Sequence, residues 1–294
     1  MIIHLFGGKS LVGSAFIDLL SNKNFKGKVI KYSRNSSDKN FQKLDLNNPK
    51  NFDPYLSDTE SVLISFVPIW ILSKFFTKIS STRPEFLRKL KKIIVCSSSS
   101  VATKKYAFNL YDKNLSENLK SAENSLIEIG KNFKFETIII QPSMIYGSYG
   151  DFHDKNINNL IKIMRKLSII FLPRNCGMRQ PIHCYELANV FFSLINNNKK
   201  SDLDYSKILI GGDNVISYYE MLLLLQKSSS KNDPIRKCKI IIIPDLIFIL
   251  LSVPFAIVSI KFFEASLRIL SNLSDFQKQS TITNKRNSNF PFKK

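Results

Sequence analysis

The sequence predicts an α/β fold in which a doubly wound parallel sheet is followed by a smaller C-terminal lobe. Three observations predict this fold class. Short apolar runs alternate with amphipathic stretches over the first 150 residues, which is typical of strands joined by crossover helices. The first apolar run, 2–6, meets two glycines, and a third, Gly13, precedes a helical apolar periodicity. After Gly150 the alternation gives way to loops and helical stretches.

The first 150 residues supply the elements of the sheet. Strands are expected at 2–6, 28–32, 41–46, 61–66, 92–96 and 136–141, and helices at 10–22, 69–90 with a break at 80–84, and 112–131. Strands separated by helices in this way pair in parallel, with helices on both faces of the sheet. We therefore expect residues 1–150 to form a Rossmann-type domain.

The remaining residues predict a smaller lobe and a tail. Helices are expected at 154–167, 185–197 and 218–227, a strand at 207–210 and a loop at 173–181. Ser217 and Glu220 have the spacing of a capping box at the start of the third of these helices. Residues 151–280 are expected to form a substrate lobe interleaved with the last strands, and 281–294 a polar tail.

The segment 240–263 is very apolar, with fifteen uncharged residues between Asp245 and Lys261. That run is shorter than the ~20 residues needed to span a bilayer. A buried helix pair is therefore expected. The alternative is a hairpin that lies on a membrane, because basic residues flank the segment on both sides.

Charge and cysteine content narrow the function classes. The chain has 294 residues and a formal net charge of +20, but its lysines are spread along it and no nucleic-acid motif is present. We therefore expect no specific nucleic-acid partner. The four cysteines are far apart and form no C-x-x-C, which argues against a zinc site and indicates a reducing compartment. No metal site is expected, and we expect a cytoplasmic protein, with the inner face of the membrane as the alternative location.

The glycines after the first strand indicate a dinucleotide-binding turn. Gly7 lets the chain turn, Gly13 lets the helix pack close to the strand, and the helix N-terminus offers N–H groups to a pyrophosphate. The pattern G-x-x-G-x-x-G would place a glycine at position 10, where this chain has Ser10. A serine can donate to a phosphate, although it crowds the approach. An ordinary strand-to-helix turn is the alternative.

The end of the second strand bears on which cofactor is bound. NAD-selective domains carry an acid there for the ribose hydroxyls, whereas this chain has Arg34 and no acid in 33–37. An arginine favours a 2′-phosphate, so NAD or NADP is expected with NADP slightly preferred. A surface arginine is the alternative.

Four segments in order, 7–13, 97–101, 141–147 and 179–188, resemble the short-chain dehydrogenase/reductase superfamily, in particular its extended NAD-dependent epimerase/dehydratase group. The third segment is similar to the group's R-P-x-x-I-Y-G stretch, with Gln141 for arginine, and the fourth to its R-x-x-x-H-V-D-D-L-A stretch. The resemblance covers about residues 2–270. It implies a nucleotide-linked or lipid-linked sugar as substrate. With the glycine turn it gives these expected cofactor-binding residues: Gly7, Gly8, Ser10, Leu11, Val12, Gly13, Arg34, Asp45, Leu46, Val67, Lys120, Pro142 and Met144.

The catalytic pair of that superfamily is missing from this chain. Its members use a tyrosine four residues before a lysine, and none of the ten tyrosines here has that partner. Lys120 matches the lysine loosely, which puts Ser116 at the tyrosine's place. Ser98 matches the residue that contacts the substrate hydroxyl, and Tyr106 or Tyr111 could supply the base. Ser98, Ser99 and Arg179 are the expected substrate-binding residues.

Two functions remain open on these observations. The first is an NAD(P)-dependent epimerase, dehydratase or reductase that acts on a nucleotide-linked or lipid-linked sugar. The second is a non-catalytic NAD(P)-binding protein with a structural or redox-sensing role, which the missing tyrosine–lysine pair favours. Either could be peripheral to a membrane through 240–263.

Overall fold

The computed structural model describes residues 1–34, 39–49, 52–53, 61–195, 205–285 and 289–291. The end of the helix expected at 185–197 and parts of the expected tail lie outside these residues. The main feature is an eight-stranded sheet in the order β16-β13-β6-β5-β4-β1-β2-β3, in which every pairing is parallel. Its strands are β1 (Ile2–Phe6), β2 (Lys28–Ser33), β3 (Gln42–Lys43), β4 (Ser61–Ser65), β5 (Leu90–Cys96), β6 (Glu136–Pro142), β13 (Tyr205–Gly211) and β16 (Gln277–Lys278).

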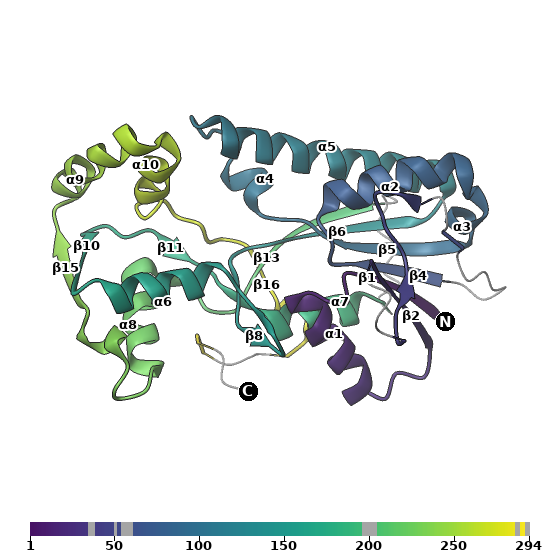
Figure 1. Ribbon diagram of the computed structural model, residues 1–294, viewed down its shortest axis with the longest axis horizontal. Helices are drawn as coiled ribbons and strands as arrows, with labels where there is room; N and C mark the ends of the chain where they lie inside the picture. Colours follow the sequence, from purple (N-terminus) through teal and green to yellow (C-terminus); the bar gives the residue numbers. More distant parts are fainter. Residues whose placement is uncertain (35–38, 50–51, 54–60, 196–204, 286–288, 292–294) are drawn as a thin grey trace.

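Helices cover both faces of this sheet (Figure 1). On one face lie α2 (Ile69–Thr82), α3 (Pro84–Lys89) and α5 (Leu110–Phe133), and on the other α1 (Leu11–Asn22), α7 (Cys184–Ile195) and α11 (Ser280–Thr283). The strand β1 shows why the layers form, because all five of its residues are buried. Ile2 and Phe6 pack into the core under α2 and α5, whereas Ile3 and Leu5 pack into the core under α1 and α7. The doubly wound fold expected from the sequence is confirmed.

The C-terminal lobe has its own small core around Met164, Leu172 and Leu222. Its elements are β7 (Ile145–Tyr146), β8 (Ser148–Tyr149), β9 (Phe152–His153), α6 (Asn156–Lys166), β10 (Ile169–Pro173), β11 (Met178–Arg179), β12 (Ile182–His183), β14 (Ile216–Ser217), α8 (Tyr218–Ser228), the 3-10 helix η2 (Pro234–Lys237) and β15 (Lys239–Ile243). The predicted capping box at α8 is present, since Ser217 and Glu220 each bond the other's backbone amide.

Two elements of the first half differ from their expected bounds. The strand expected at 41–46 pairs only over Gln42–Lys43, because it lies at the edge of the sheet and pairs with β2 alone. The break expected within 69–90 falls at Arg83, where Pro84 starts the short helix α3.

The expectation of a buried helix pair at 240–263 is wrong. The segment forms β15 followed by α9 (Asp245–Val258) and α10 (Ile260–Leu267), and in α9 only Phe248 and Ser252 are buried. The lobe's core is already closed by α6, α8 and η2, so these two helices lie outside it. Among the helices of the described residues, none combines the length and the hydropathy needed to cross a membrane.

Candidate functional site

A cavity of about 450 Å³ opens at the carboxyl ends of β1, β2 and β4. This is the edge of an open parallel sheet at which ligands bind, because loops and helix N-termini converge there. The cavity is lined by Phe6, Gly7, Lys9, Ser10, Tyr32, Ser33, Arg34, Leu44, Asp45, Leu46, Asn47, Phe66, Val67, Pro68 and Ile71. Six of the thirteen predicted cofactor-binding residues are among them: Gly7, Ser10, Arg34, Asp45, Leu46 and Val67.

The turn from β1 into α1 requires glycine at two positions. Gly7 has a φ of +76°, and a Cβ there would come within 2.8 Å of the Phe66 carbonyl carbon. A Cβ on Gly13 would lie 2.1 Å from the Gly7 carbonyl oxygen. The start of α1 therefore lies in direct contact with the turn that follows β1, as the sequence predicted. The other predicted residues of this turn are neighbours of lining residues in the sequence, but they are not themselves among the lining residues: Gly8, Leu11, Val12 and Gly13.

Ser10 caps α1. Its Oγ donates a hydrogen bond to the Gly7 carbonyl at 2.7 Å and accepts one from the Gly13 amide at 3.2 Å. The hydroxyl is thus engaged within the turn, so a phosphate would meet backbone amides there. The first-turn amides of Leu11 and Val12 have no carbonyl within the helix to bond to. They carry the positive end of the helix dipole, and the first turn contains no acid to offset it.

Two basic side chains line the cavity. Lys9 follows the second glycine, and its Nζ lies 4.9 Å from the centre of the Phe41 ring, while Arg34 lies exposed at the end of β2. Among the lining residues that follow β3, the Asp45 carboxylate accepts the Asn47 amide at 3.0 Å. The cavity thus offers positive charge near the glycine turn and an acid near Asn47.

Several lining residues were missed by the sequence prediction: Phe6, Lys9, Tyr32, Ser33, Leu44, Asn47, Phe66, Pro68 and Ile71. Most of them directly precede or follow a residue that was predicted, at the ends of β1, β2 and β4. A usable signal was therefore present, because adjacent residues at a strand end share one loop. Tyr32 adds a buried hydroxyl that bonds His4 Nδ1 at 3.0 Å, and burial, followed by the charge of Asp53, raises the Tyr32 pKa.

Three predicted residues lie away from this cavity. Lys120 is exposed on α5 and lines a different, shallow depression with Glu117, Ser121, Asn124, Ser125 and Glu128. Pro142 ends β6, and Met144 packs against the core of the C-terminal lobe. The structure therefore does not bring these three to the lining formed by the glycine turn.

The serine segment after β5 is tied to a buried carboxylate. Glu123 of α5 is fully buried and accepts hydrogen bonds from Ser97 Oγ at 2.6 Å and from Gln141 Nε2 at 2.8 Å, and it pairs with Lys207 Nζ at 3.1 Å. Gln141 is the residue that takes the place of arginine in the stretch resembling R-P-x-x-I-Y-G. Its side-chain amide donates to the Glu123 carboxylate. Ser98 and Ser99 stay half-buried, and Ser98 Oγ accepts the Ser100 amide at 3.2 Å.

The face of α5 that looks onto the sheet carries neither tyrosine nor lysine. Its buried residues are Asp112, Ser116, Leu119, Ala122, Glu123, Leu126, Ile127 and Gly130. Ser116, at the place of the missing tyrosine, donates its hydroxyl to the Val101 carbonyl at 2.9 Å. It is therefore fixed to the backbone that follows the serines.

Tyr106 and Tyr111 lie at the surface. Tyr106 is 81% exposed and Tyr111 is 62% exposed. Lys261 of α10 places its Nζ 3.5 Å from the centre of the Tyr111 ring. Both rings thus belong to a solvent-facing segment beside α10, and neither is among the residues that line the cavity.

Arg179 has a structural position. It is buried and donates hydrogen bonds to the carbonyls of Met178 at 2.8 Å, Ser271 at 2.7 Å and Arg268 at 2.6 Å. Burial lowers its pKa. Its guanidinium thus holds the 268–271 turn against β11, and the expectation that Arg179 binds substrate stays a prediction.

A second cavity of about 580 Å³ is lined by residues of β7–β9, α6, β12, α7 and α8, among them Tyr146 and His183, and contains none of the predicted site residues. Among the described residues, no group of three or more His, Cys, Asp or Glu side chains is placed to hold a metal ion.

No protein-family model matches the sequence, and no curated protein matches it. Solved structures do resemble the fold. UDP-glucuronic acid 4-epimerase from Bacillus cereus, solved with NAD, has a TM-score of 0.63 at 18% identity, over 97% of this chain and 92% of that chain. A nucleoside-diphosphate-sugar epimerase from Staphylococcus aureus has a TM-score of 0.63 at 12% identity, over 98% of each chain. The dTDP-glucose 4,6-dehydratase from Bacillus anthracis, also solved with NAD, has a TM-score of 0.54 at 15% identity, over 83% of this chain and 85% of that chain. The chain therefore has the fold of NAD-dependent sugar epimerases and dehydratases, as the resemblance implied.

Proposed function

We propose that this protein binds NAD or NADP in the cavity at the ends of β1, β2 and β4, and that it is a sugar-modifying enzyme of the epimerase, dehydratase or reductase type. The observation that carries the proposal is the glycine turn: Gly13 allows α1 to start against the end of β1, and Gly7 and Ser10 of this turn line the cavity. The substrate would be a nucleotide-linked or lipid-linked sugar. One structural neighbour, the B. cereus epimerase, was solved with UDP-glucuronic acid and NAD.

The residues present fit such a cofactor. The absent side chains of Gly7 and Gly13 leave the turn compact, and the amides of Leu11 and Val12 suit a diphosphate. Lys9 adds a positive charge beside it, and Arg34 suits a 2′-phosphate. When bound, the nicotinamide would accept or supply a hydride.

The chain's own contribution to the chemistry would centre on Ser98. Its half-buried hydroxyl follows β5 and can orient a substrate hydroxyl, but a serine without a partner is a poor base. Tyr106 or Tyr111 would have to supply proton transfer from the segment after the serines. Because both rings are exposed and neither has a lysine four residues on, turnover through them should be slow.

A second candidate function is a non-catalytic NAD(P)-binding protein. The observation that favours it is that the sheet-facing side chains of α5 already have structural partners. Ser116 bonds the Val101 carbonyl, and Leu119 packs in the core. The Glu123 carboxylate is bonded by Ser97, Gln141 and Lys207. No titratable group on this face is left to serve a substrate hydroxyl.

Cofactor binding is tested by replacing Gly13 with valine. The new side chain would collide with Gly7, so Gly13→Val should weaken NAD and NADP at least tenfold in calorimetry. Gly150→Asn is the matched control, because its position is open and lies outside the cavity. If Gly13→Val does not fold, Lys9→Ser should weaken both cofactors less severely. Unchanged affinity in a folded Gly13→Val protein would place the cofactor elsewhere.

The two functions are separated by turnover. The protein with bound cofactor is incubated with a panel of UDP-, dTDP- and lipid-diphosphate-linked sugars, and products are followed by nuclear magnetic resonance. Conversion of any sugar that is lost in Ser98→Ala supports the enzyme. Tight cofactor binding without conversion of any sugar supports the non-catalytic function.

A further inference from the structure

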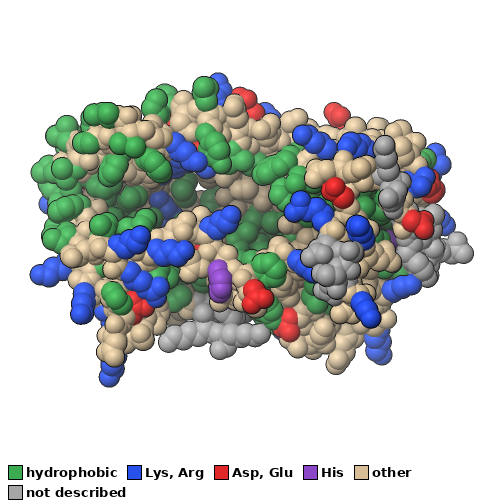
Figure 2. Space-filling view, in the orientation of Figure 1, with side chains coloured by type: hydrophobic (Ala, Val, Ile, Leu, Met, Phe, Trp, Pro, Cys, Tyr) green, Lys and Arg blue, Asp and Glu red, His purple; other side chains and the backbone are tan. Residues whose placement is uncertain are grey.

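The helices α9 and α10 present an apolar surface to solvent. Figure 2 shows hydrophobic side chains crowded over the end of the molecule that carries these helices. The large exposed side chains on them are Leu246, Ile247, Leu250, Leu251, Val253, Phe255, Ile257, Val258, Ile260 and Phe262. Ile257 is 87% exposed and Leu250 is 60% exposed. A helix at the surface of a protein normally carries polar side chains on its solvent-facing side. The exposed residues of α9 are instead apolar on more than one side of the helix.

The surface continues onto the neighbouring strand pair. Phe171 of β10 and Ile241 of β15 are partners in the parallel register, so both side chains lie on the same face of that pair, and both are exposed. The strand β10 also packs against α9. The helices and these strands together form what we call the apolar face of the C-terminal lobe.

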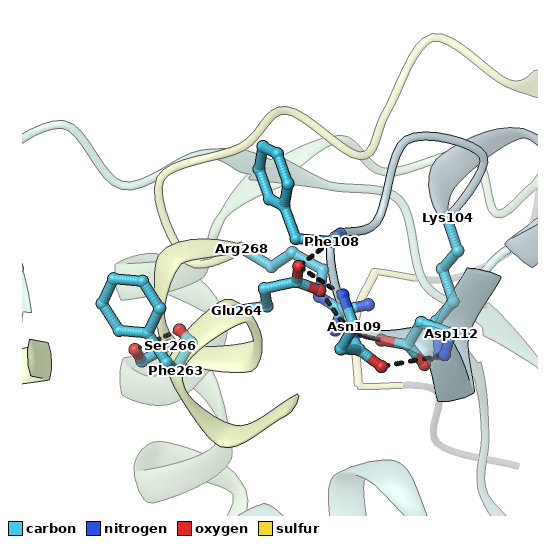
Figure 3. A network of polar contacts seen from close by, with 8 residues as sticks. All are labelled: Lys104, Phe108, Asn109, Asp112, Phe263, Glu264, Ser266 and Arg268. Carbon is cyan, nitrogen blue, oxygen red and sulfur yellow. Dashed lines mark hydrogen bonds and ion pairs between the residues drawn. The ribbon is translucent and has the colours of Figure 1, made fainter. Parts of the chain in front are cut away.

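The segment 104–111 adds a third part. Tyr106, Phe108, Leu110 and Tyr111 are all exposed, Phe108 by 90%. This segment is fixed to α10 by a polar network (Figure 3). Glu264 of α10 accepts the amides of Phe108 and Asn109, the latter at 2.9 Å. The apolar side chains of the segment are thus held next to those of α10, although they are far apart in the sequence.

The same network fixes the first turn of α5, into which the segment leads. Asp112 is fully buried and receives Lys104 Nζ at 2.7 Å, Arg268 Nη2 and Asn109 Nδ2. Burial alone would raise the Asp112 pKa, but these three donors lower it to about 2. The carboxylate therefore stays ionised at neutral pH and holds α5 to α10.

Basic side chains surround the apolar face, and the acids near it are occupied. Lys166 ends α6 shortly before β10, Arg174 directly follows β10, Lys239 starts β15, and Lys261 lies on α10, all of them exposed. By contrast, Asp245 is bonded by the amide and side chain of Asn175, and Glu264 by the network described above. The margin of the apolar face is therefore positive.

We propose that this face binds an anionic lipid bilayer and inserts the outer side of α9, α10 and residues 106–111 into its interfacial region. Apolar side chains rimmed by lysine and arginine match the acyl and headgroup layers of such a surface. The exposed tyrosines have the character of interfacial anchors. A second copy of this chain fits less well, because it would bring a second positive margin and another net charge of +20 to the same contact.

The dimensions favour a helix lying in the plane of the membrane. The 14 residues of α9 measure about 21 Å, which is shorter than the ~30 Å hydrocarbon core. Pro254 lies inside α9, and α10 follows after a break at Ser259. A flat hairpin buried to the headgroup boundary satisfies its backbone within each helix, as a lipid environment requires.

Flotation with lipid vesicles tests the proposal on the full chain without cofactor or sugar, so the result does not depend on the proposed function. The protein should float with vesicles that contain phosphatidylglycerol and phosphatidylcholine, and much less with phosphatidylcholine alone. Leu250→Glu/Ile257→Glu should bind the anionic vesicles at least tenfold more weakly. Lys26→Glu is the control, because it changes the net charge equally, by −2, at an exposed position between α1 and β2.

A fluorescence measurement reports the depth of insertion. The chain has one tryptophan, Trp70, so the background variant is Trp70→Phe. In that background, Ile257→Trp should shift its emission to the blue on addition of anionic vesicles and should be quenched by brominated acyl chains. Lys26→Trp in the same background should show neither change.

Three results would overturn the proposal. The first is no flotation of the wild-type chain with anionic vesicles. The second is equal flotation of wild type and Leu250→Glu/Ile257→Glu. The third is a dimer in analytical ultracentrifugation that the double variant abolishes while vesicle binding is absent, which would assign the face to a second copy.

Discussion

Ser10 sits where the glycine pattern expects its middle glycine, and its hydroxyl closes the turn by bonding Gly7 and Gly13. The positions of Gly7 and Gly13 could be predicted, because the need for glycine comes from local backbone crowding. The direction of the Ser10 hydroxyl could not, since it depends on how the strand end and the helix start are placed in space. The same holds for Arg179, whose partners at 268 and 271 are about ninety residues away in the sequence.

Arg34 is the residue on which cofactor choice should depend. It lines the cavity at the end of β2 and is exposed, so it can approach a 2′-phosphate. A charge-assisted bond of this kind is worth about 1.5–3 kcal/mol. Arg34→Ala should therefore weaken NADP about tenfold or more and leave NAD nearly unchanged in calorimetry. Lys43→Ala on β3 is the control for charge alone, and equal losses for NAD and NADP in Arg34→Ala would contradict the assignment.

His4 should make the fold sensitive to acid. It is buried in β1, and burial lowers its pKa from 6.5 to about 4. Between pH 6.5 and pH 4, His4 is protonated in the unfolded chain but neutral in the folded chain. The free energy of unfolding therefore falls as the pH falls from 6.5 toward 4. The loss by pH 5 should be about 2 kcal/mol. Urea unfolding at pH 7.5 and pH 5 measures it, and His4→Gln should show a smaller difference between the two pH values than wild type does.

At the scale of elements, buried strands were the most predictable part and α9–α10 the least. A strand buried on both faces is a continuous apolar run, as in β1 and β4. The run at 246–260 is equally apolar, which made burial the natural expectation. An apolar composition favours burial, but only the structure shows that the lobe's core forms among β10, α6, α8 and η2 without residues of α9 or α10.

The contact between α5 and α10 should depend on Asp112. Asp112→Asn would leave Lys104 and Arg268 facing a neutral amide in a buried position, at a cost of about 3 kcal/mol in the free energy of unfolding. We expect faster amide hydrogen exchange in α10 and in 104–111, whereas exchange in β1 and β4 should hardly change. Lys113→Ala, an exposed neighbour on α5, is the control. Equal exchange in α10 of wild type and Asp112→Asn would show that the network does not hold this helix.

At the scale of the whole molecule, the sheet and the edge that holds the first cavity follow from the sequence, whereas the relation between the lobes does not. The alternation of strands and helices is written into local periodicity. The network of Asn109, Asp112, Glu264 and Arg268 joins residues about 155 positions apart, and no local pattern announces such a pair. For that reason Tyr106 and Tyr111 could be proposed as bases from their place in the chain, while the structure puts them on the surface beside α10.

The net charge of +20 should act in opposite directions on two properties of the molecule. Added salt screens the repulsion among lysines and arginines within the folded chain, which should raise its melting temperature by a few degrees between about 20 and 300 mM NaCl. The same screening should weaken binding to anionic vesicles, because salt screens the attraction between the basic margin of the apolar face and the anionic headgroups. Scanning calorimetry and vesicle flotation across one salt series measure both trends. Vesicle binding that is insensitive to salt would mean that the lysines at the margin contribute nothing and that the apolar side chains act alone.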